Sequence, residues 1–193
     1  MRAYGNIESN LEDITLIETV NTGLPEEYDI RNNLRPVINQ GSINSCSSVA
    51  VSELIDYETS FKKIEREKLD PHELFYKRAN KKIKGMSLRE SFEIFDKDYD
   101  TITYAHAKSD LVIKSSILTN GPVAIGLPVK NLDNDIFWKG DSSNKIGHAV
   151  VFVGWTNKGF ILKNSWGNIY GSKGYIIFPY EDFNYIKECW TLI

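Results

Sequence analysis

The feature that most constrains this chain is a change of periodicity near its middle. From Cys46 to about Lys68, apolar residues recur at helical spacing, and neither proline nor glycine interrupts them. Beyond residue 122, short apolar runs rich in β-branched residues alternate with glycines, which predicts strands joined by turns. Helices followed by strands indicate an α+β fold, and we expect the two halves to meet along a cleft.

Local signals place the remaining elements. Asp70 followed by Pro71 predicts the start of a second helix, with the aspartate as N-cap. Ser87 with Glu90 forms a capping-box pattern and predicts a third helix. A last helix is predicted over 112–118, closed by Asn-Gly-Pro. The predicted strands cover residues 123–127, 149–153, 160–163, 175–178 and 189–192.

Composition narrows the class of protein. The 193 residues, 41% hydrophobic and 12% aromatic, suffice for one domain or one tightly joined two-lobed unit with a sizeable core. A net charge of −3 without a basic stripe argues against a nucleic-acid partner. No apolar run approaches the ~20 residues that span a bilayer, so we expect no membrane partner. The first ten residues carry no secretory signal pattern.

The chain contains two cysteines, Cys46 and Cys189. Secreted domains of this size usually carry more, so we expect an intracellular reducing compartment, the cytoplasm or a viral particle. Cys189 lies beside Trp190 in an apolar run and is expected to be buried and inert. The two cysteines and three scattered histidines have no zinc-type spacing, so we expect neither a metal nor a cofactor.

Cys46 is the candidate nucleophile. A thiol attacks a carbonyl as the thiolate, and the first turn of a helix supplies unpaired N–H groups that favour negative charge. A histidine must take the proton. His72, in the first turn of a surface helix, and His106, in a connecting stretch, are expected to be structural. His148 directly precedes an apolar strand and is the candidate base, although a structural role is an equal alternative on this context alone.

Asn164 ends the apolar run that we expect to pair with the His148 strand as a hairpin. Its amide oxygen can accept the ring N–H of His148 and fix the tautomer, as the acid does in a serine triad. Trp166 can cover that hydrogen bond and exclude water. Taken alone, this segment is more typical of a turn asparagine beside a core tryptophan.

Together, Cys46, His148, Asn164 and their neighbours resemble the papain and cathepsin family of cysteine peptidases. The most specific blocks are Gly-His-Ala-Val at 147–150 and Asn-Ser-Trp-Gly at 164–167. The resemblance runs from about Leu24 to the C-terminus in the family's order. Further similar segments are 24–31, 36–41, 120–123 and 171–175.

The resemblance implies a papain-like two-lobed α+β fold. It implies a helical lobe at about 40–118, an antiparallel β lobe at about 119–193 and an active site in the cleft between them. It assigns catalytic roles to Cys46, His148 and Asn164, an oxyanion-hole amide to Gln40, and support of the site to Trp166.

The departures from the family pattern concern the surroundings of the nucleophile. The family's Cys-Gly-Ser-Cys-Trp is replaced by Ile-Asn-Ser-Cys-Ser at 43–47, so a disulfide cysteine and a large aromatic are both missing. His148 follows Cys46 by 102 residues, against about 130–150 in papain-like enzymes, which indicates trimmed loops. The chain therefore resembles a compact member lacking the usual disulfides and prodomain. Residues 1–23 form an extension that is either a remnant of a prodomain or a segment that reaches toward the cleft, and the apolar patch at 14–20 favours the second.

We therefore expect a cysteine endopeptidase, monomeric, that acts on peptides or proteins through a thiolate–imidazolium pair and an acyl-enzyme. Two alternatives stay open. One is a catalytically silent relative used as a binding module, favoured by Ser47 and the trimmed loops. The other is an amidase or transferase with Cys–His chemistry on a related scaffold.

Overall fold

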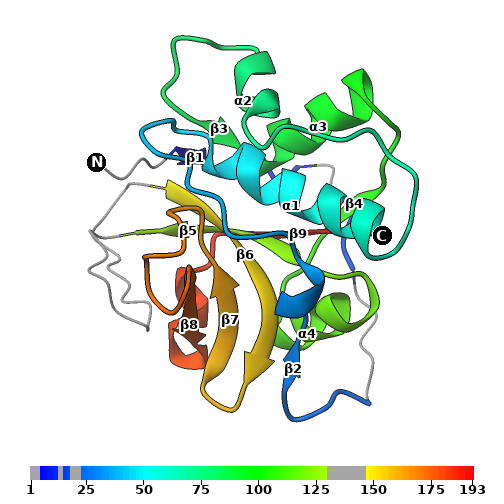
Figure 1. Ribbon diagram of the computed structural model, residues 1–193, viewed down its shortest axis with the longest axis vertical. Coiled ribbons are helices and arrows are strands. Elements are labelled where there is room, and N and C mark those ends of the chain that lie inside the picture. The colour runs from blue at the N-terminus through cyan, green and yellow to red at the C-terminus, as the bar shows by residue number, and fades with distance from the viewer. Residues whose placement is uncertain (1–4, 13–14, 18–22, 130–146) are drawn as a thin grey trace.

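The computed structural model describes residues 5–12, 15–17, 23–129 and 147–193. Three helices gather in the upper part of the molecule, and most of the sheet forms the lower part (Figure 1). The fold is therefore α+β, as predicted. The helices are α1 (Cys46–Ser60), α2 (Glu73–Lys77), α3 (Leu88–Asp98) and α4 (Asp110–Thr119), with 3₁₀ turns at Arg31–Asn33 and Tyr180–Tyr185. The strands are β1 (Asn6–Ile7), β2 (Tyr28–Asp29), β3 (Met86–Ser87), β4 (Tyr104–His106), β5 (Val123–Pro128), β6 (Gly147–Thr156), β7 (Gly159–Lys163), β8 (Tyr175–Pro179) and β9 (Glu188–Leu192).

Strand β6 organises the sheet. It pairs antiparallel with β5, β7, β2 and β1, and the main path of the sheet runs β3-β1-β6-β5-β9-β4. The predicted β6–β7 hairpin is confirmed, with Val151 opposite Lys163. A two-residue turn at 157–158 and a β-bulge between Phe152 and Trp155 together set this register, which brings the beginning of β6 level with the segment that follows β7.

Helix α1 crosses the boundary between the helices and the sheet (Figure 1). It is buried along most of its length and packs on β6, β5 and α3. Its residues Val51, Leu54 and Ile55 belong to the hydrophobic core, which continues into the sheet through Phe152 and Phe160. Burial on several sides fixes the position of the first turn of α1, and with it the position of Cys46.

Helix α1 is shorter than the periodicity predicts, since it ends at Ser60 and not near Lys68. The reason is tertiary. The chain turns back so that Arg66 pairs with Glu58 at 2.6 Å and with Asp100 at 2.8 Å. Both carboxylates are reached only when residues 61–66 leave the helix, so these ion pairs override a favourable helical propensity.

Two other local predictions are corrected. Helix α2 begins at Glu73 with His72 as N-cap, and the Asp70 carboxylate closes the turn before the helix by accepting the His72 backbone N–H at 2.8 Å. Ser87 caps α3 as predicted, but Glu90 does not complete a capping box. Its carboxylate accepts the Ala79 backbone N–H at 3.1 Å instead.

The N-terminal segment is part of the sheet. Strand β1 lies between the two parts of the molecule, parallel to β3 on one side and antiparallel to β6 on the other. Of the apolar patch predicted to reach the cleft, residues 15–17 are described, and they run along β4 through Leu16 and His106. The rest of that patch lies outside the described residues. Within the described part of the chain, no helix has the length and apolar character needed to cross a membrane.

Candidate active site

Cys46 is the first residue of α1 and is fully buried. Burial raises the pKa of its thiol, while the backbone N–H groups of Ala149, Gly5 and Ser47 act in the opposite direction. The contact with Ala149 places the sulfur against the beginning of β6, one residue beyond His148. The packing of α1 on β6 thus brings Cys46 to the beginning of β6, although about a hundred residues separate the two in the sequence.

His148, near the beginning of β6, donates to Asn164. The distance between His148 Nε2 and Asn164 Oδ1 is 2.9 Å, and both side chains are buried. The same amide oxygen accepts the Ser165 backbone N–H at 2.7 Å, which identifies that atom as the oxygen. Nε2 must therefore carry the proton, and Nδ1 is the basic nitrogen of the neutral ring.

Burial holds the His148 imidazole neutral in this arrangement. Desolvation lowers its pKa to about 4, and the hydrogen bond with Asn164 opposes that shift. Trp166 covers the ring, with centroids 4.6 Å apart and planes inclined by 19°. The indole covers one face of the imidazole and thereby helps to keep water away from the hydrogen bond between His148 and Asn164.

Gln40 joins the segment before α1 to the segment after β7. Its backbone N–H donates to the Ser165 carbonyl at 2.8 Å, and its side-chain oxygen accepts the Ser165 hydroxyl. Its amide nitrogen donates to the Ile43 carbonyl at 2.7 Å. Gln40 is thus held firmly beside the first turn of α1, with one amide N–H occupied by the chain itself.

A buried ion pair links the helix of Cys46 to the strand before Asn164. Lys163 Nζ lies 2.6 Å from Glu53 Oε1 and 2.6 Å from the Arg35 carbonyl. Arg35 reaches the other Glu53 oxygen at 3.0 Å. Because burial lowers the pKa of Lys163 whereas Glu53 raises it, the charged lysine depends on this partner.

Sequence reasoning missed this ion pair, although one signal was available. Glu53 falls seven residues after Cys46 on the buried side of α1, where an unpaired carboxylate would be costly. A charged residue in that position requires a basic partner from elsewhere in the fold. The sequence does not say which of 23 lysines and arginines supplies it.

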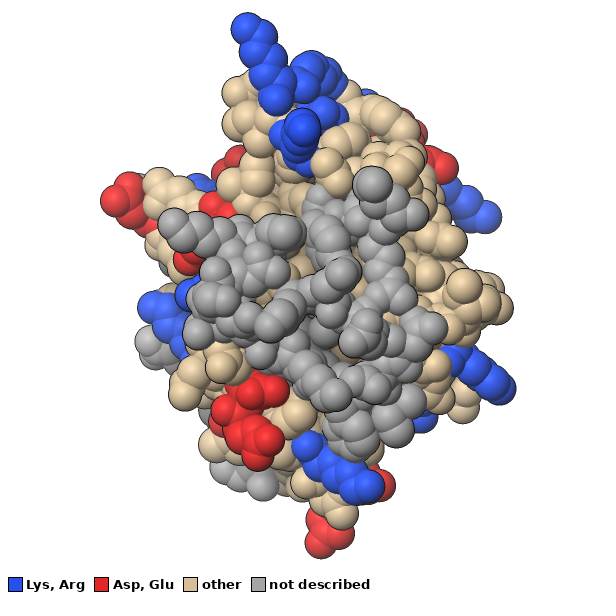
Figure 2. Space-filling model, turned by 90° about the vertical axis from the view of Figure 1, so that its left-hand side faces the viewer, with Lys and Arg blue, Asp and Glu red and all other residues tan. Residues whose placement is uncertain are grey.

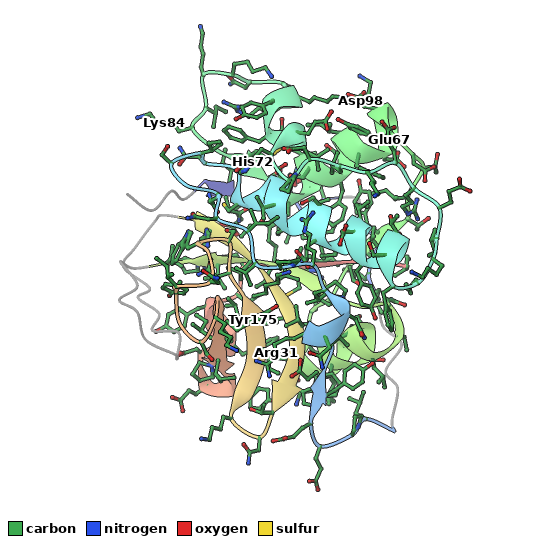
Figure 3. All side chains as sticks on the ribbon, viewed as in Figure 1. Arg31, Glu67, His72, Lys84, Asp98 and Tyr175 are labelled. Carbon is green, nitrogen blue, oxygen red and sulfur yellow. The ribbon has the colours of Figure 1, made fainter. Side chains whose placement is uncertain are left out.

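The other two histidines lie apart from the His148–Asn164 pair. His72 accepts from or donates to Ser45 Oγ at 2.7 Å, above the first turn of α1 (Figure 3). His106 lies in β4 and not in a connecting stretch, so that prediction is corrected. Its Nε2 accepts the Cys189 backbone N–H at 3.3 Å. Cys189 is buried and free, as is Cys46.

The arrangement can carry out nucleophilic catalysis. A thiol at a helix N-terminus, an imidazole in a fixed tautomer and a side-chain amide are gathered where α1 meets β6 and β7. A small cavity is lined by Cys46, Asn164 and Ser165, by the ion-paired Glu53 and Lys163, and by neighbouring apolar residues. Among the described residues, no group of three His, Cys, Asp or Glu side chains is placed to hold a metal ion.

The chain is similar in sequence to proteins of known activity. The sequence profile of a family described as "Papain family cysteine protease" matches residues 56–189, which include His148, Asn164 and Trp166. A cathepsin L-like proteinase from Phaedon cochleariae is 27% identical, over 86% of this chain and 64% of its own length. Cathepsin B-like cysteine proteinase 1 from Haemonchus contortus is 32% identical, over 46% of this chain and 28% of its own length. The chain thus spans less than two thirds of these relatives.

Solved structures share the fold at low sequence identity. Xylellain, a cysteine protease from Xylella fastidiosa, superposes with a TM-score of 0.81 at 20% identity, covering 99% of this chain and 96% of its own. The digestive procathepsin L2 proteinase from Tenebrio molitor gives 0.80 at 17% identity, covering 99% of this chain and 78% of its own. The two-lobed architecture expected from the sequence is therefore the observed one.

Proposed function

Because the chain belongs to the papain family of cysteine proteases, we propose that it hydrolyses peptide bonds with Cys46 as nucleophile and His148 as base. The observation that carries the proposal is the His148–Asn164 hydrogen bond at the point where the first turn of α1 meets β6. This bond leaves Nδ1 as the nitrogen able to accept a proton.

The first half of the reaction uses groups from the first turn of α1, from the segment before it and from β6. His148 Nδ1 takes the proton of the Cys46 thiol, and the thiolate attacks the carbonyl carbon of the scissile peptide bond. The backbone N–H of Cys46 and the Gln40 amide stabilise the negative charge that develops on the carbonyl oxygen. The imidazolium then protonates the leaving amine, and an acyl-enzyme remains on the sulfur.

Water completes the cycle. His148 removes a proton from the attacking water and returns it to the departing thiolate, so that the acid product leaves and the enzyme is restored. Asn164 keeps the ring in one orientation through both halves. For the His148 imidazole to become charged, water must reach it, because its pKa of about 4 belongs to the fully buried ring.

Hydrolysis of an unfolded protein substrate such as reduced casein tests the proposal. Wild type and Cys189→Ala should both release peptides, whereas Cys46→Ala should release none. Mass spectrometry during turnover should find an acyl adduct on the peptide containing Cys46. Absence of hydrolysis in the wild type after the thiol has been made accessible would favour the binding-module alternative, and cleavage restricted to small amides would favour the amidase.

A further inference from the structure

The three longest helices of the described chain all begin after a serine, and one of these serines behaves differently. Ser87 before α3 and Ser109 before α4 have extended backbones, each with ψ of 159°, and each hydroxyl accepts the N–H three residues further along. Ser45 before α1 has ψ of 18° and makes no side-chain cap bond. Serine is a favoured N-cap residue because its oxygen satisfies an unpaired N–H of the first turn. The helix that carries Cys46 is therefore the one whose serine does not cap it.

The hydroxyl of Ser45 is bound to another helix. It shares a hydrogen bond of 2.7 Å with Nδ1 of His72, the residue that precedes α2. Ser45 is 0% exposed, so its hydroxyl depends on a partner within the protein. His72 lies 27 positions further along the chain, and α2 packs against α1 near its first turn (Figure 1). His72 is thus the partner that the fold gives to this buried hydroxyl.

A second serine of the same turn strengthens the link between the two helices. Ser48, one helical turn after Ser45, donates its hydroxyl to the Pro71 carbonyl at 2.8 Å. Asp70 accepts the backbone N–H of His72 at 2.8 Å and so fixes the turn that carries the histidine. Residues 70–72 therefore hold two hydroxyls from the beginning of α1, and both are directed away from the end of the helix.

This arrangement preserves the positive potential at the N-terminus of α1. The unpaired N–H groups of a first turn favour a negative charge, and a cap oxygen that accepts one of them weakens that effect. At Cys46 the potential acts on the sulfur, since the backbone N–H of Ser47 favours the thiolate. Under the proposed function it also acts on the substrate's carbonyl oxygen, through the Cys46 N–H. A hydroxyl that turned back onto this end would compete for the same N–H groups.

Competition of this kind is the ordinary behaviour of a serine at the start of a helix. Its short side chain readily accepts N–H groups two or three residues further along the chain. Ser87 and Ser109 do so in this molecule. Without its partner, the Ser45 hydroxyl would be left buried beside the N–H groups of the residues at 47 and 48, which are the donors that a cap uses.

We propose that His72 is a positioning residue of the active site. It holds the Ser45 hydroxyl away from the N-terminus of α1, so that the first-turn N–H groups stay available to the Cys46 thiolate and to the oxyanion. This role deepens the proposed function and rests on it. His72 acts through Ser45 and takes no part in proton transfer, which remains with His148.

A double substitution tests this role. His72→Ala frees the Ser45 hydroxyl, and we expect kcat to fall about tenfold with KM within about twofold of wild type, since these N–H groups act mainly in the transition state. Ser45→Ala removes the competing oxygen, so the double variant Ser45→Ala/His72→Ala should recover most of the lost kcat. His72→Asn, whose side-chain amide can take the place of Nδ1, should also stay close to wild type. A purely structural role of His72 predicts the opposite for the double variant, which would then be at least as slow as His72→Ala.

Titration of the thiolate gives a second measurement that does not depend on turnover. The ultraviolet absorbance of the Cys46 thiolate is obtained as the difference from Cys46→Ala in each background. It should appear at higher pH in His72→Ala than in wild type, and return toward the wild-type curve in the double variant. Ser109→Ala is the matched control, because it deletes a serine hydroxyl that does cap its helix. It should lower the denaturation temperature and leave kcat and the thiolate titration as in wild type.

The proposal fails if the double variant is as slow as His72→Ala, or if His72→Ala turns over and titrates like wild type. If no protein hydrolyses peptides, wild type included, but the thiolate titration shifts in His72→Ala and recovers in the double variant, the positioning role stands and the proposed function fails. If wild type and His72→Ala hydrolyse peptides at the same rate, the proposed function stands and the positioning role fails.

Discussion

The molecule contains two sites with the same three residue types, and they differ in what surrounds them. One holds Cys46, His148 and Trp166, and the other holds Cys189, His106 and Trp190. In both, the thiol is buried with a raised pKa, and burial lowers the pKa of the histidine to about 4. Residue identity and burial therefore do not make a nucleophile.

The difference lies in the directions of polar groups. Backbone N–H groups point at the sulfur of Cys46, whereas the carboxyl of Glu188 lies beside Cys189 and raises its pKa further. Trp166 stacks on His148 at 19°, while Trp190 meets His106 edge-on at 83°. His148 Nε2 donates to Asn164 and leaves Nδ1 basic, whereas His106 Nε2 accepts the Cys189 backbone N–H, which places the proton of that ring on Nδ1.

The largest effect on activity is expected from substituting His148, with His106 as the comparison. His148→Ala should lower kcat by about 10²–10⁴, since the general base is lost. His106→Gln should keep activity within about twofold, because a glutamine oxygen can still accept the Cys189 N–H. Both rates are measured on the same peptide substrate. Equal losses in the two variants would mean that the sites are not functionally different.

Gln40→Ala is expected to lower kcat by about 10²–10³, the usual cost of one lost oxyanion donor. Ser165→Ala is the control, because it removes the hydrogen-bond partner of Gln40 but leaves the amide N–H groups in place. Its kcat should fall less, and its KM should change little. A Gln40→Ala enzyme that turned over like the wild type would exclude this residue from the mechanism.

Acid should destabilise the fold through both histidines. Their pKa of about 4 in the folded protein lies below the ordinary 6.5, so the unfolded chain binds more protons between these pH values. The free energy of unfolding should therefore fall as pH drops from 6.5 to 4, by up to about 1.4 kcal/mol per pH unit for each histidine.

His106→Gln isolates one of these contributions. Urea denaturation at pH 6.5 and pH 4.5 should show a smaller loss of stability in the variant than in the wild type. The difference between the two proteins cancels the opposite contribution of Glu188, whose pKa is raised. Identical pH slopes would show that His106 titrates normally in the folded protein.

The smallest effect is expected at the rim of the cleft. Basic side chains gather at the upper end of the face in Figure 2, and Lys84 points outward from the segment leading into β3 (Figure 3). It lines a groove next to β1 with Asn44, Ile83 and Gly147. Lys84→Glu should lower kcat/KM about threefold for acidic peptides, an effect that salt weakens. Exposed Lys158→Glu, on the β6–β7 turn, should change nothing.

The part of the site that β6 and β7 contribute was largely predictable, because it depends on residues that are close in the sequence. The two apolar runs and the Asn157-Lys158 turn between them predict the β6–β7 hairpin, but a β-bulge between Phe152 and Trp155, which the sequence did not reveal, shifts the register that places His148 and Asn164 within one hydrogen bond. For Cys46, the sequence predicted its position in the first turn of a helix. The end of that helix at Ser60 could not be predicted, because the ion pairs of Arg66 with Glu58 and Asp100 decide it.

The amino-acid order alone determined the α+β class, the candidate nucleophile and the strand pairing that orients its base, since these depend on periodicities and short separations. Only the packed chain decided that Asn6 meets Ser47 and Glu188, 41 and 182 residues away, and that Lys163 meets Glu53 across 110. Buried polar groups require partners, and any of many residues can supply them. Which one does so depends on how the two halves of the molecule come together.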